Sequence, residues 1–452
     1  MKRTSVVFIA LFLIISLVPS LGITVWGSSQ AAANEILSPV PKVTDSGGNF
    51  NTDYLNQLSD RFADTFALRQ EFISIWSAFN AKLLSTSVEP QVTLGKDSWL
   101  FYTSTLDDYT GQLLSDREIF MAANNLALMQ EYAESCGARF VFTIAPNKNS
   151  VYPQYMPSSI EHGGKSSSSL LTQQLDSLSV NYADMFEAFN RDEVLYFITD
   201  SHWNSRGAAL AADTLMERLG RESSYFNADF IGFTEHKGDL YEMLYPAGKF
   251  TEADPIYPYK LDYSCLNDPN GGNAISIETA SNGKGKLICW RDSFGISLYP
   301  YLAENFEAVM FSRSTTYDLC QIPANEYDYV IIELVERNIE WLIAKAPVLP
   351  APAREITLSD TEGECCSVKF GPGKSQTTEE LSCLTASIPY DWTDNESHVY
   401  VMTDTGIYEA CQIAGDSNTL GVSAWLDARS ALTGIICEKN GEAILHPIEI
   451  IE

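Results

Sequence analysis

Apolar runs of strand length alternate with helical patterns through the middle of the chain. Strand-like runs cover residues 138–144, 287–290 and 329–334, and segments with helical spacing separate them. Strands separated by helices need crossover connections, which favour a mostly parallel sheet covered by helices on both faces. The pattern therefore predicts an α/β fold whose functional site lies at the carboxyl edge of the sheet.

Helices are predicted over residues 116–135, 166–178 and 205–219, with Ser205 as the N-cap of the third. Upstream, residues 52–84 carry apolar side chains at near-helical spacing, which predicts an amphipathic helix packed on the core. Residues 92–102 alternate around a polar turn and predict a hairpin. Residues 220–285 are less regular and indicate an insertion or a lid.

A run with three prolines and three alanines, residues 346–353, separates two regions of different pattern. Residues 52–345 carry the α/β pattern of the predicted catalytic domain. Residues 354–452 contain short strand-like segments between turn residues, so we expect a small β-rich, sandwich-like C-terminal domain.

The N-terminus has two basic residues followed by a largely apolar run from residue 6 to residue 26. Residues 1–33 are interpreted as either a cleaved signal peptide or an N-terminal membrane anchor. Residues 34–51 follow as a polar linker. Both interpretations place the rest of the chain outside the cytoplasmic membrane, anchored at its outer face or secreted.

The composition excludes several classes of partner. The chain has 59 acidic and 29 basic residues, which gives a net charge of −30. Nucleic-acid binding needs a basic face, so nucleic acid is excluded as a partner. The charge does not exclude neutral glycans as partners. Nine cysteines without C-x-x-C spacing argue against zinc and leave at least one thiol unpaired. No glycine-rich loop follows a strand, so we expect no nucleotide cofactor.

Two short polar segments follow strand-like runs and carry the chemistry of acyl transfer. Asp200 lies two residues before His202, and Ser293 lies where an apolar run gives way to a helical pattern. A serine nucleophile needs a base, and the base needs an orienting carboxylate. We predict Ser293 as nucleophile, His202 as base and Asp200 as orienter. Metal binding at Asp200 and His202 is a weaker alternative because it needs further ligands.

Four other residues are weaker candidates for binding an oxyanion or substrate, and each has a purely structural alternative. Asn147 and Lys148 follow a strand and either donate to the ligand or solvate a loop. Arg337 either binds substrate or pairs with Glu336. Trp203 is either a platform for a sugar ring or a core anchor.

The order and spacing of several motifs resemble the SGNH-hydrolase-like proteins of the alginate O-acetyltransferase kind, and more closely the DHHW-motif proteins of Gram-positive bacteria. The resemblance covers roughly residues 60–343 and includes Pro-Asn-Lys at 146–148, Asp-Ser-His-Trp at 200–203 and Arg-Asp-Ser-Phe-Gly at 291–295. Tyr299 matches a tyrosine that the alginate enzymes keep near the acetyl group. Two positions depart from the pattern: Ser201 replaces a histidine, and Arg291 replaces the glycine of Gly-Asp-Ser.

The resemblance implies an exported O-acetyltransferase that passes an acetyl group from Ser293 to a hydroxyl of a cell-surface or secreted polysaccharide. It also implies a membrane-bound O-acyltransferase as the partner that supplies the acetyl group. Two alternatives stay open. One is a polysaccharide acetylesterase, in which water replaces the sugar, and the other is a non-catalytic surface protein that binds glycans.

Overall fold

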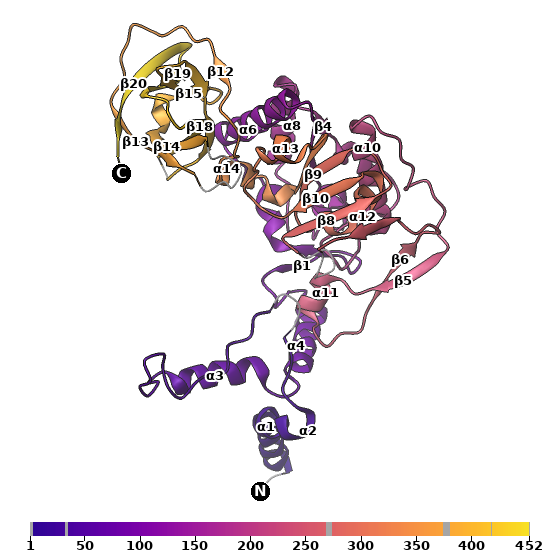
Figure 1. Cartoon of the computed structure of the whole chain (residues 1–452). Helices are drawn as coiled ribbons and strands as arrows, with labels where there is room; N and C mark the ends of the chain where they lie inside the picture. Colours follow the sequence, from indigo (N-terminus) through magenta and orange to yellow (C-terminus); the bar gives the residue numbers. More distant parts are fainter. Residues whose placement is uncertain (1–2, 32–34, 268–273, 374–379, 417, 452) are drawn as a thin grey trace.

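The computed structural model describes residues 3–31, 35–267, 274–373, 380–416 and 418–451 (Figure 1). Its centre is a seven-stranded sheet in the order β4-β3-β11-β9-β10-β8-β7. The first five strands are parallel, and β8 and β7 add an antiparallel edge. The prediction of a mostly parallel sheet is confirmed. The strands are β3 (Arg139–Ala145), β4 (Tyr182–Ala183), β7 (Tyr263–Cys265), β8 (Ser276–Ser281), β9 (Lys286–Trp290), β10 (Ala308–Ser312) and β11 (Tyr329–Val335).

Helices cover both faces of this sheet, and successive strand residues feed two different cores. Ile288 and Trp290 of β9 pack with α6 (Asp116–Ser135) and α8 (Ser167–Ser177). Leu287 and Cys289 pack on the other side with α10 (Ser205–Arg218) and α12 (Gly295–Asn305). Burial on both faces explains why the strand sequences read as continuous apolar runs. Shorter helices are α5 (Leu106–Tyr109), α7 (Lys148–Val151), α9 (Met185–Phe189), α13 (Gln321–Asn325) and α14 (Trp341–Ala344), with 3-10 turns η1 (Thr103–Thr105), η2 (Pro153–Tyr155), η3 (Glu336–Asn338) and η4 (Tyr390–Trp392).

The helix starts follow side-chain caps, with one correction to the prediction. Ser115 and Ser166 cap α6 and α8 as their positions require. The N-cap of α10 is Asn204 and not Ser205, because the Asn204 side chain accepts the N–H groups of Arg206 and Gly207 at 3.0 Å. Helix α10 thus begins three residues after His202.

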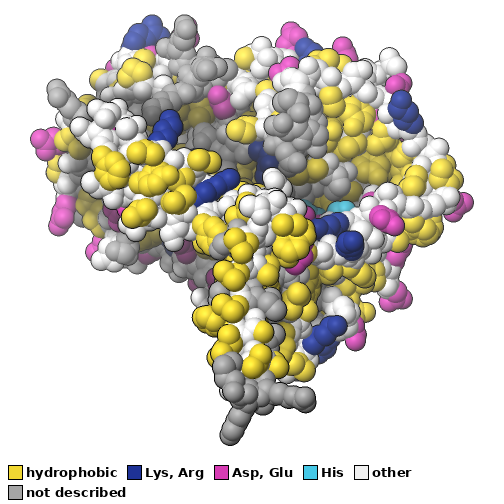
Figure 2. Space-filling model, turned by 90° about the horizontal axis from the view of Figure 1, so that it is seen from below, with side chains coloured by type: hydrophobic (Ala, Val, Ile, Leu, Met, Phe, Trp, Pro, Cys, Tyr) yellow, Lys and Arg dark blue, Asp and Glu magenta, His cyan; other side chains and the backbone are white. Residues whose placement is uncertain are grey.

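The predicted long helix over residues 52–84 is wrong in two respects. The chain forms α3 (Tyr54–Thr65) and α4 (Arg69–Leu84), separated by Leu68 at a left-handed φ of 61°. Its apolar side chains are also not buried: Leu58, Phe62, Phe72, Ile75 and Phe79 are 38–67% exposed. Figure 2 shows hydrophobic side chains gathered on the face that carries the N-terminal helices.

The chain begins with α1 (Arg3–Leu21) and α2 (Ile23–Trp26). Among the described residues, no helix combines the length and the apolar character needed to cross a membrane. The export segment and its cleavage remain predictions.

The predicted hairpin over residues 92–102 is confirmed. Strands β1 (Val92–Leu94) and β2 (Leu100–Tyr102) pair antiparallel, with Thr93 opposite Phe101. Asp97 and Ser98 in the turn have φ values of 53° and 67°. Left-handed residues of this kind match the twist of two antiparallel strands.

The irregular region forms an ordered hairpin beside the Asp200 loop. Strands β5 (Gly232–His236) and β6 (Glu252–Ile256) pair antiparallel, and α11 (Asp239–Leu244) lies between them. The Glu252 carboxylate accepts the N–H groups of Ile198 and Thr199 at 2.6 and 2.7 Å. This segment therefore braces the loop that carries Asp200 and His202.

The C-terminal part is β-rich, as predicted, but its strands form one continuous sheet that curls over (Figure 1) and not the two separate sheets of a sandwich. Neighbouring strands are antiparallel except β13 and β20. All nine cysteines of the protein are free thiols. The strands are β12 (Ala353–Arg354), β13 (Cys366–Pro372), β14 (Leu381–Pro389), β15 (Val399–Thr403), β16 (Ile407–Glu409), β17 (Cys411–Ala414), β18 (Thr419–Asp427), β19 (Leu432–Lys439) and β20 (Glu442–Ile450).

A buried arginine on α6 ties the two regions together. The Arg117 guanidinium donates to the carbonyl oxygens of Asp394 and Ser397 at 2.8 and 2.7 Å, and to the Gln412 side chain. Burial lowers the pKa of Arg117 to about 10. The C-terminal sheet is thus fixed to α6 by polar contacts in addition to apolar packing.

We predict that Arg117→Met lowers the free energy of unfolding by about 3 kcal/mol, because several buried acceptors lose their donor. Urea unfolding followed by circular dichroism measures this loss. Arg429→Gln, which removes an exposed ion pair with Asp427, serves as the control and should leave the unfolding midpoint in place. Equal midpoints for Arg117→Met and the wild type would contradict the prediction.

Candidate active site

Ser293 lies in the turn between β9 and α12, at the carboxyl edge of the sheet. The buried Asp292 carboxylate fixes this turn by accepting the N–H of Phe294 at 2.9 Å and the N–H of Val335 at 2.8 Å. The Asn338 amide donates to the same carboxylate at 3.0 Å. The turn is therefore held from its own helix and from the end of β11.

The structure brings the three predicted residues together. His202 Nε2 lies 2.9 Å from Ser293 Oγ, and His202 Nδ1 lies 2.7 Å from Asp200 Oδ1. Because an ionised carboxylate can only accept hydrogen bonds, His202 Nδ1 must be protonated and donate to Asp200. In the neutral imidazole this leaves Nε2 free to accept the Ser293 hydroxyl proton.

Lys148 lies beneath the Asp200 loop and holds its backbone. Its Nζ donates to the carbonyl oxygens of Phe197, Ile198 and Asp200 at 3.0, 2.9 and 2.5 Å. Burial lowers the pKa of Lys148 to about 8, even though nearby carboxylates favour its charged form. The Glu252 carboxylate accepts the N–H groups of the same loop, so both the carbonyl and the N–H groups of its backbone are hydrogen-bonded.

Two residues that the sequence pattern did not reveal complete the surroundings of Asp200. Its Oδ2 accepts from His236 Nε2 at 2.8 Å and from the N–H of Asp239 at 3.0 Å. The Asp239 carboxylate accepts the Ser201 hydroxyl at 2.6 Å and lies 3.7 Å from His202 Nδ1. Both residues reach the site through the β5–β6 hairpin, so no local spacing in the sequence marks them.

These contacts set the charges of the site. Burial would raise the pKa of Asp200, but the hydrogen bonds from His202 and His236 hold it well below its usual range. Burial would lower the pKa of His202, but the hydrogen bond and charge of Asp200, with the charge of Asp239, raise it above its usual value. Burial and the neighbouring Asp200 charge raise the pKa of Asp239.

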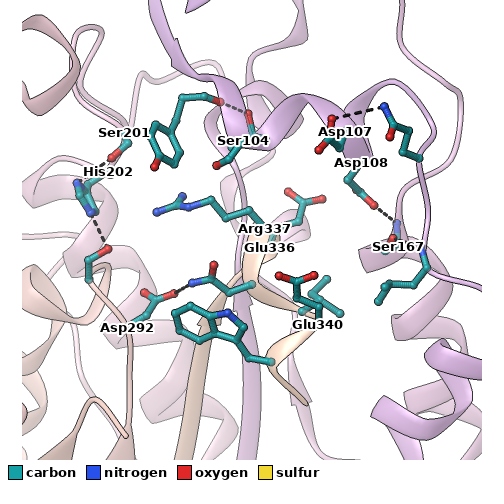
Figure 3. A pocket seen from close by; sticks show the side chains of 18 of the residues that line it. Ser104, Asp107, Asp108, Ser167, Ser201, His202, Asp292, Glu336, Arg337 and Glu340 are labelled. Carbon is teal, nitrogen blue, oxygen red and sulfur yellow. Dashed lines mark hydrogen bonds between the residues drawn. The ribbon is translucent and has the colours of Figure 1, made fainter. Parts of the chain in front are cut away.

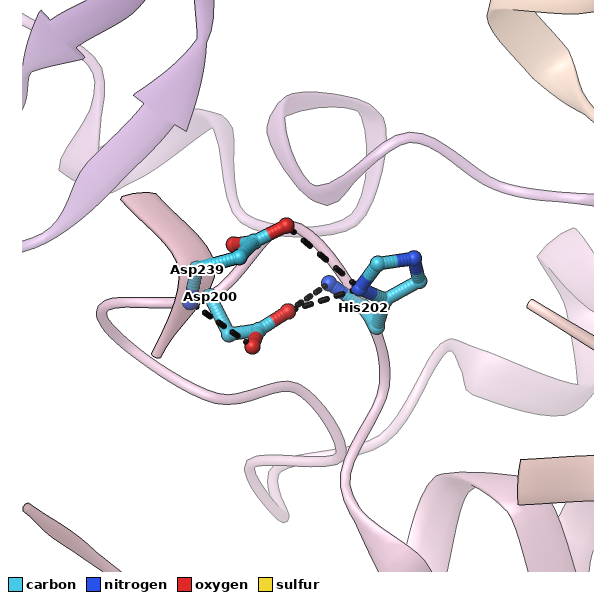
Figure 4. A group of neighbouring side chains, drawn as sticks. All are labelled: Asp200, His202 and Asp239. Atoms are coloured by element: carbon cyan, nitrogen blue, oxygen red, sulfur yellow. Dashed lines mark hydrogen bonds and ion pairs between the residues drawn. The ribbon is translucent and has the colours of Figure 1, made fainter. Parts of the chain in front are cut away.

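Figure 4 shows the Asp200 and Asp239 carboxylates facing one edge of the His202 ring. Within the described ranges, these three residues form the one group of donor atoms, all within 4.8 Å of one another, that could hold a metal ion. The same atoms hydrogen-bond to neighbouring protein groups: Asp200 Oδ1 with His202, and Asp239 Oδ2 with Ser201. These carboxylate oxygens therefore already have hydrogen-bond partners in the protein, and the network they form orients the His202 ring.

Ser293 and His202 open onto a cavity of about 840 Å³. Arg337 extends across this cavity between His202 and the acidic side chains of Asp108 and Glu340 (Figure 3). Its guanidinium carbon lies 5.6 Å from the centre of the Phe294 ring and 5.3 Å from that of Tyr102. Arg337 therefore brings a positive charge to the same pocket as Ser293.

The predicted ion pair between Glu336 and Arg337 is wrong. Glu336 is buried and accepts the hydroxyls of Ser150 and Ser168 at 2.6 Å and the N–H of Asn147 at 2.8 Å. In the part of the chain that the structure describes, no ion pair involves Arg337. Its side chain thus remains directed into the cavity.

Four other candidates do not line the cavity, and their contacts show why. Lys148 uses its ammonium group on backbone carbonyls. Trp203 is 1% exposed and donates to Ser297 Oγ, so it is a core anchor. Asn147 is buried with its backbone N–H on Glu336. Tyr299 is buried against Phe311.

The unusual Arg291 also points away from the cavity. Its guanidinium donates to the carbonyl oxygen of Asp292 at 3.0 Å, and its aliphatic chain packs so closely on Gly295 that a Cβ there would lie 2.4 Å from Arg291 Cδ. Gly295 thus makes room for Arg291 at the start of α12. Arg291 is therefore not among the residues that line the cavity beside Ser293.

Comparison with known proteins bears out the resemblance that the motifs indicated. Residues 92–260 match the family model of the SGNH hydrolase-like domain of the acetyltransferase AlgX. The chain is 27% identical over 202 residues to a probable alginate O-acetylase AlgJ of Pseudomonas putida, covering 42% of this chain and 50% of the relative. A second AlgJ, of Pseudomonas syringae pv. tomato, is 27% identical over 214 residues, covering 43% and 51%. The chain thus spans about half the length of the curated relatives it matches.

Solved structures with a similar chain include a DHHW family protein from Eubacterium siraeum, at 17% identity and a TM-score of 0.40, covering 50% of this chain and 89% of that one. The O-acetyltransferase domain of Pseudomonas putida AlgJ has 18% identity and a TM-score of 0.36, covering 55% and 91%. The family-model match over residues 92–260 supports an SGNH-hydrolase-like fold for that part of the chain. Among proteins of that class, the chain is similar to the AlgJ and AlgX proteins and to the DHHW family.

We predict that His202 titrates above the value of about 6.5 that is usual for histidine. Asp200→Asn removes the carboxylate that favours the charged ring, so burial then dominates and the pKa of His202 falls. A pH titration of the histidine side chains by ¹⁵N NMR measures both values. His446, in the C-terminal sheet, is the internal reference that the substitution should not move. A His202 pKa that Asp200→Asn leaves unchanged would show that the contact is absent in solution.

Proposed function

We propose that this chain is an exported O-acetyltransferase that transfers an acetyl group through Ser293 to a hydroxyl of a cell-surface or secreted polysaccharide. The observation that carries the proposal is the hydrogen-bonded chain from Ser293 Oγ through His202 to Asp200, opening onto a cavity. The names of the relatives, alginate O-acetylase and acetyltransferase, support acetyl as the group transferred. The apolar N-terminal segment supports export.

Two successive acyl transfers follow from this geometry. Ser293 Oγ attacks the acetyl carbonyl while His202 Nε2 takes its proton, and the donor's leaving group departs with that proton. His202 then removes the proton of a sugar hydroxyl, whose oxygen attacks the acetyl-serine. Collapse of the second tetrahedral intermediate forms the sugar ester and returns the proton to Ser293. Asp200 stabilises the imidazolium at both stages.

The negative charge of each tetrahedral intermediate needs donors beside Ser293. The backbone N–H groups at the start of α12 and the Arg337 guanidinium are the groups that we assign to this role. Arg337 lies against the same Phe294 ring as His202, whose centroid is 4.9 Å from that ring. Its positive charge therefore acts close to the reacting carbonyl.

The cavity favours an uncharged acceptor. Its wall carries the carboxylates of Asp107, Asp108 and Glu340, together with Asp239 near His202, and the two arginines Arg313 and Arg337 only partly offset them. A pocket of this sign repels polyanions. The acetyl donor in this scheme is a membrane-bound O-acyltransferase, which the family resemblance implies.

We predict that the protein, given an activated acetyl ester and neutral oligosaccharides, forms acetylated sugar in excess over free acetate. Oligouronates of the same length, offered in parallel, should be acetylated more slowly. Mass spectrometry of the sugars and an acetate assay measure the two products. Ser293→Ala should abolish both, and Ser314→Ala, at an exposed loop serine, should change neither.

Other product patterns identify the alternatives. Free acetate in excess over acetylated sugar at every acceptor concentration would make the protein an esterase. Glycan binding that survives Ser293→Ala, with no acyl chemistry in the wild type, would make it a binding protein.

A further inference from the structure

The Asp200 carboxylate is held at both oxygens, and only one of them faces His202. Oδ1 takes the ring and backbone N–H of His202 at 2.7 and 2.9 Å. Oδ2 takes the ring of His236 at 2.8 Å. Asp200 is 4% exposed, so each of these donors compensates a charge that has lost most of its water.

The position of His236 is fixed by packing as well as by this hydrogen bond. It ends strand β5, opposite Glu252 in the hairpin. Its ring stacks on Phe197 with the ring centres 3.8 Å apart and an interplanar angle of 14°. A ring clamped on one face and bonded at Nε2 has little freedom to turn away from Asp200.

We propose that His236 is a positioning residue for acyl transfer, which holds Asp200 from behind so that the carboxylate stays in line with His202 Nδ1. The functional chain is then His236–Asp200–His202–Ser293. The proposal rests on the proposed function, because it assigns His236 a part in the same reaction.

His236 also tunes the basicity of His202. A donor on Oδ2 draws negative charge away from Oδ1, and a weaker negative partner supports the His202 imidazolium less strongly. The charged groups that face His236 are Asp200, Asp254 and Glu252. Burial would lower the pKa of His236, but Asp200 and these two carboxylates raise it. The protonated ring adds a positive charge behind Asp200, which acts on His202 in the same direction.

Three substitutions separate the hydrogen bond from the ring. His236→Gln keeps an N–H donor of similar reach, His236→Asn is too short, and His236→Phe keeps the stacked ring without a donor. We expect kcat for acetyl-ester turnover to fall about tenfold in the Asn and Phe variants, the size of one hydrogen bond to a charged group. The Gln variant should stay within about twofold, and KM should be unchanged in all three because His236 does not line the cavity.

The pH profile gives a readout that a structural role would not move. Without the donor, Asp200 is more negative, so the pKa of His202 rises, and the acidic limb of kcat/KM moves to higher pH by about half a unit. The same shift should appear in a ¹⁵N NMR titration of His202, which needs no turnover. It should appear in the Asn and Phe variants and not in the Gln variant.

His398→Gln is the matched control, because His398 Nδ1 bonds the buried Glu409 at 2.7 Å in the C-terminal sheet, far from Ser293 in sequence. It should lower thermal stability without changing kcat or the His202 titration. The proposal is overturned if folded His236→Phe and His236→Asn proteins keep the wild-type rate and the wild-type His202 pKa. That result contradicts the role of His236 alone, whereas a wild type without ester turnover contradicts the proposed function itself.

Discussion

The structure around the site depends on one buried negative charge, the Asp200 carboxylate. An ionised carboxylate removed from water is costly unless donors replace the water. Four donors do so here, from the ring and backbone of His202, the ring of His236 and the backbone of Asp239. To bring these donors together, the loop after residue 196 must meet the β5–β6 hairpin. The need to pair this charge thus fixes where two distant segments of the chain lie.

The same segments are supported by a second layer of polar contacts. Lys148 holds the carbonyl oxygens of the Asp200 loop, and Glu252 holds its N–H groups. The Asp292 carboxylate likewise accepts backbone N–H groups and fixes the turn that carries Ser293. These contacts fix the two loops that hold Ser293 and His202 at hydrogen-bonding distance. This preorganisation is what electrostatic stabilisation of an oxyanion requires.

The sequence predicted the features that depend on local pattern. Apolar runs predicted the parallel strands, and a polar residue after the run at 287–290 predicted Ser293 at the carboxyl edge of β9. The apolar run before Asp200 was wrongly predicted to be a strand: residues 194–199 join none of the described sheets, and Tyr196 makes only an isolated bridge with Trp203. Contacts between distant segments were not predictable. His236 lies in a turn-rich stretch, and only the pairing of the β5–β6 hairpin brings it to Asp200. Lys148 follows β3 as Ser293 follows β9, yet its ammonium group donates to backbone carbonyls. The apolar spacing of α4 gave no sign that its apolar side chains are exposed.

The central claim is that Ser293 carries the acetyl group, and intact-mass spectrometry tests it most directly. The wild-type protein, Ser293→Ala and His202→Ala are each exposed to an activated acetyl ester, quenched in acid, weighed and mapped by peptide digestion. The account predicts one acetyl adduct on Ser293 in the wild type and none in either variant. A folded wild type that stays unmodified, or an adduct that persists in Ser293→Ala, would contradict it.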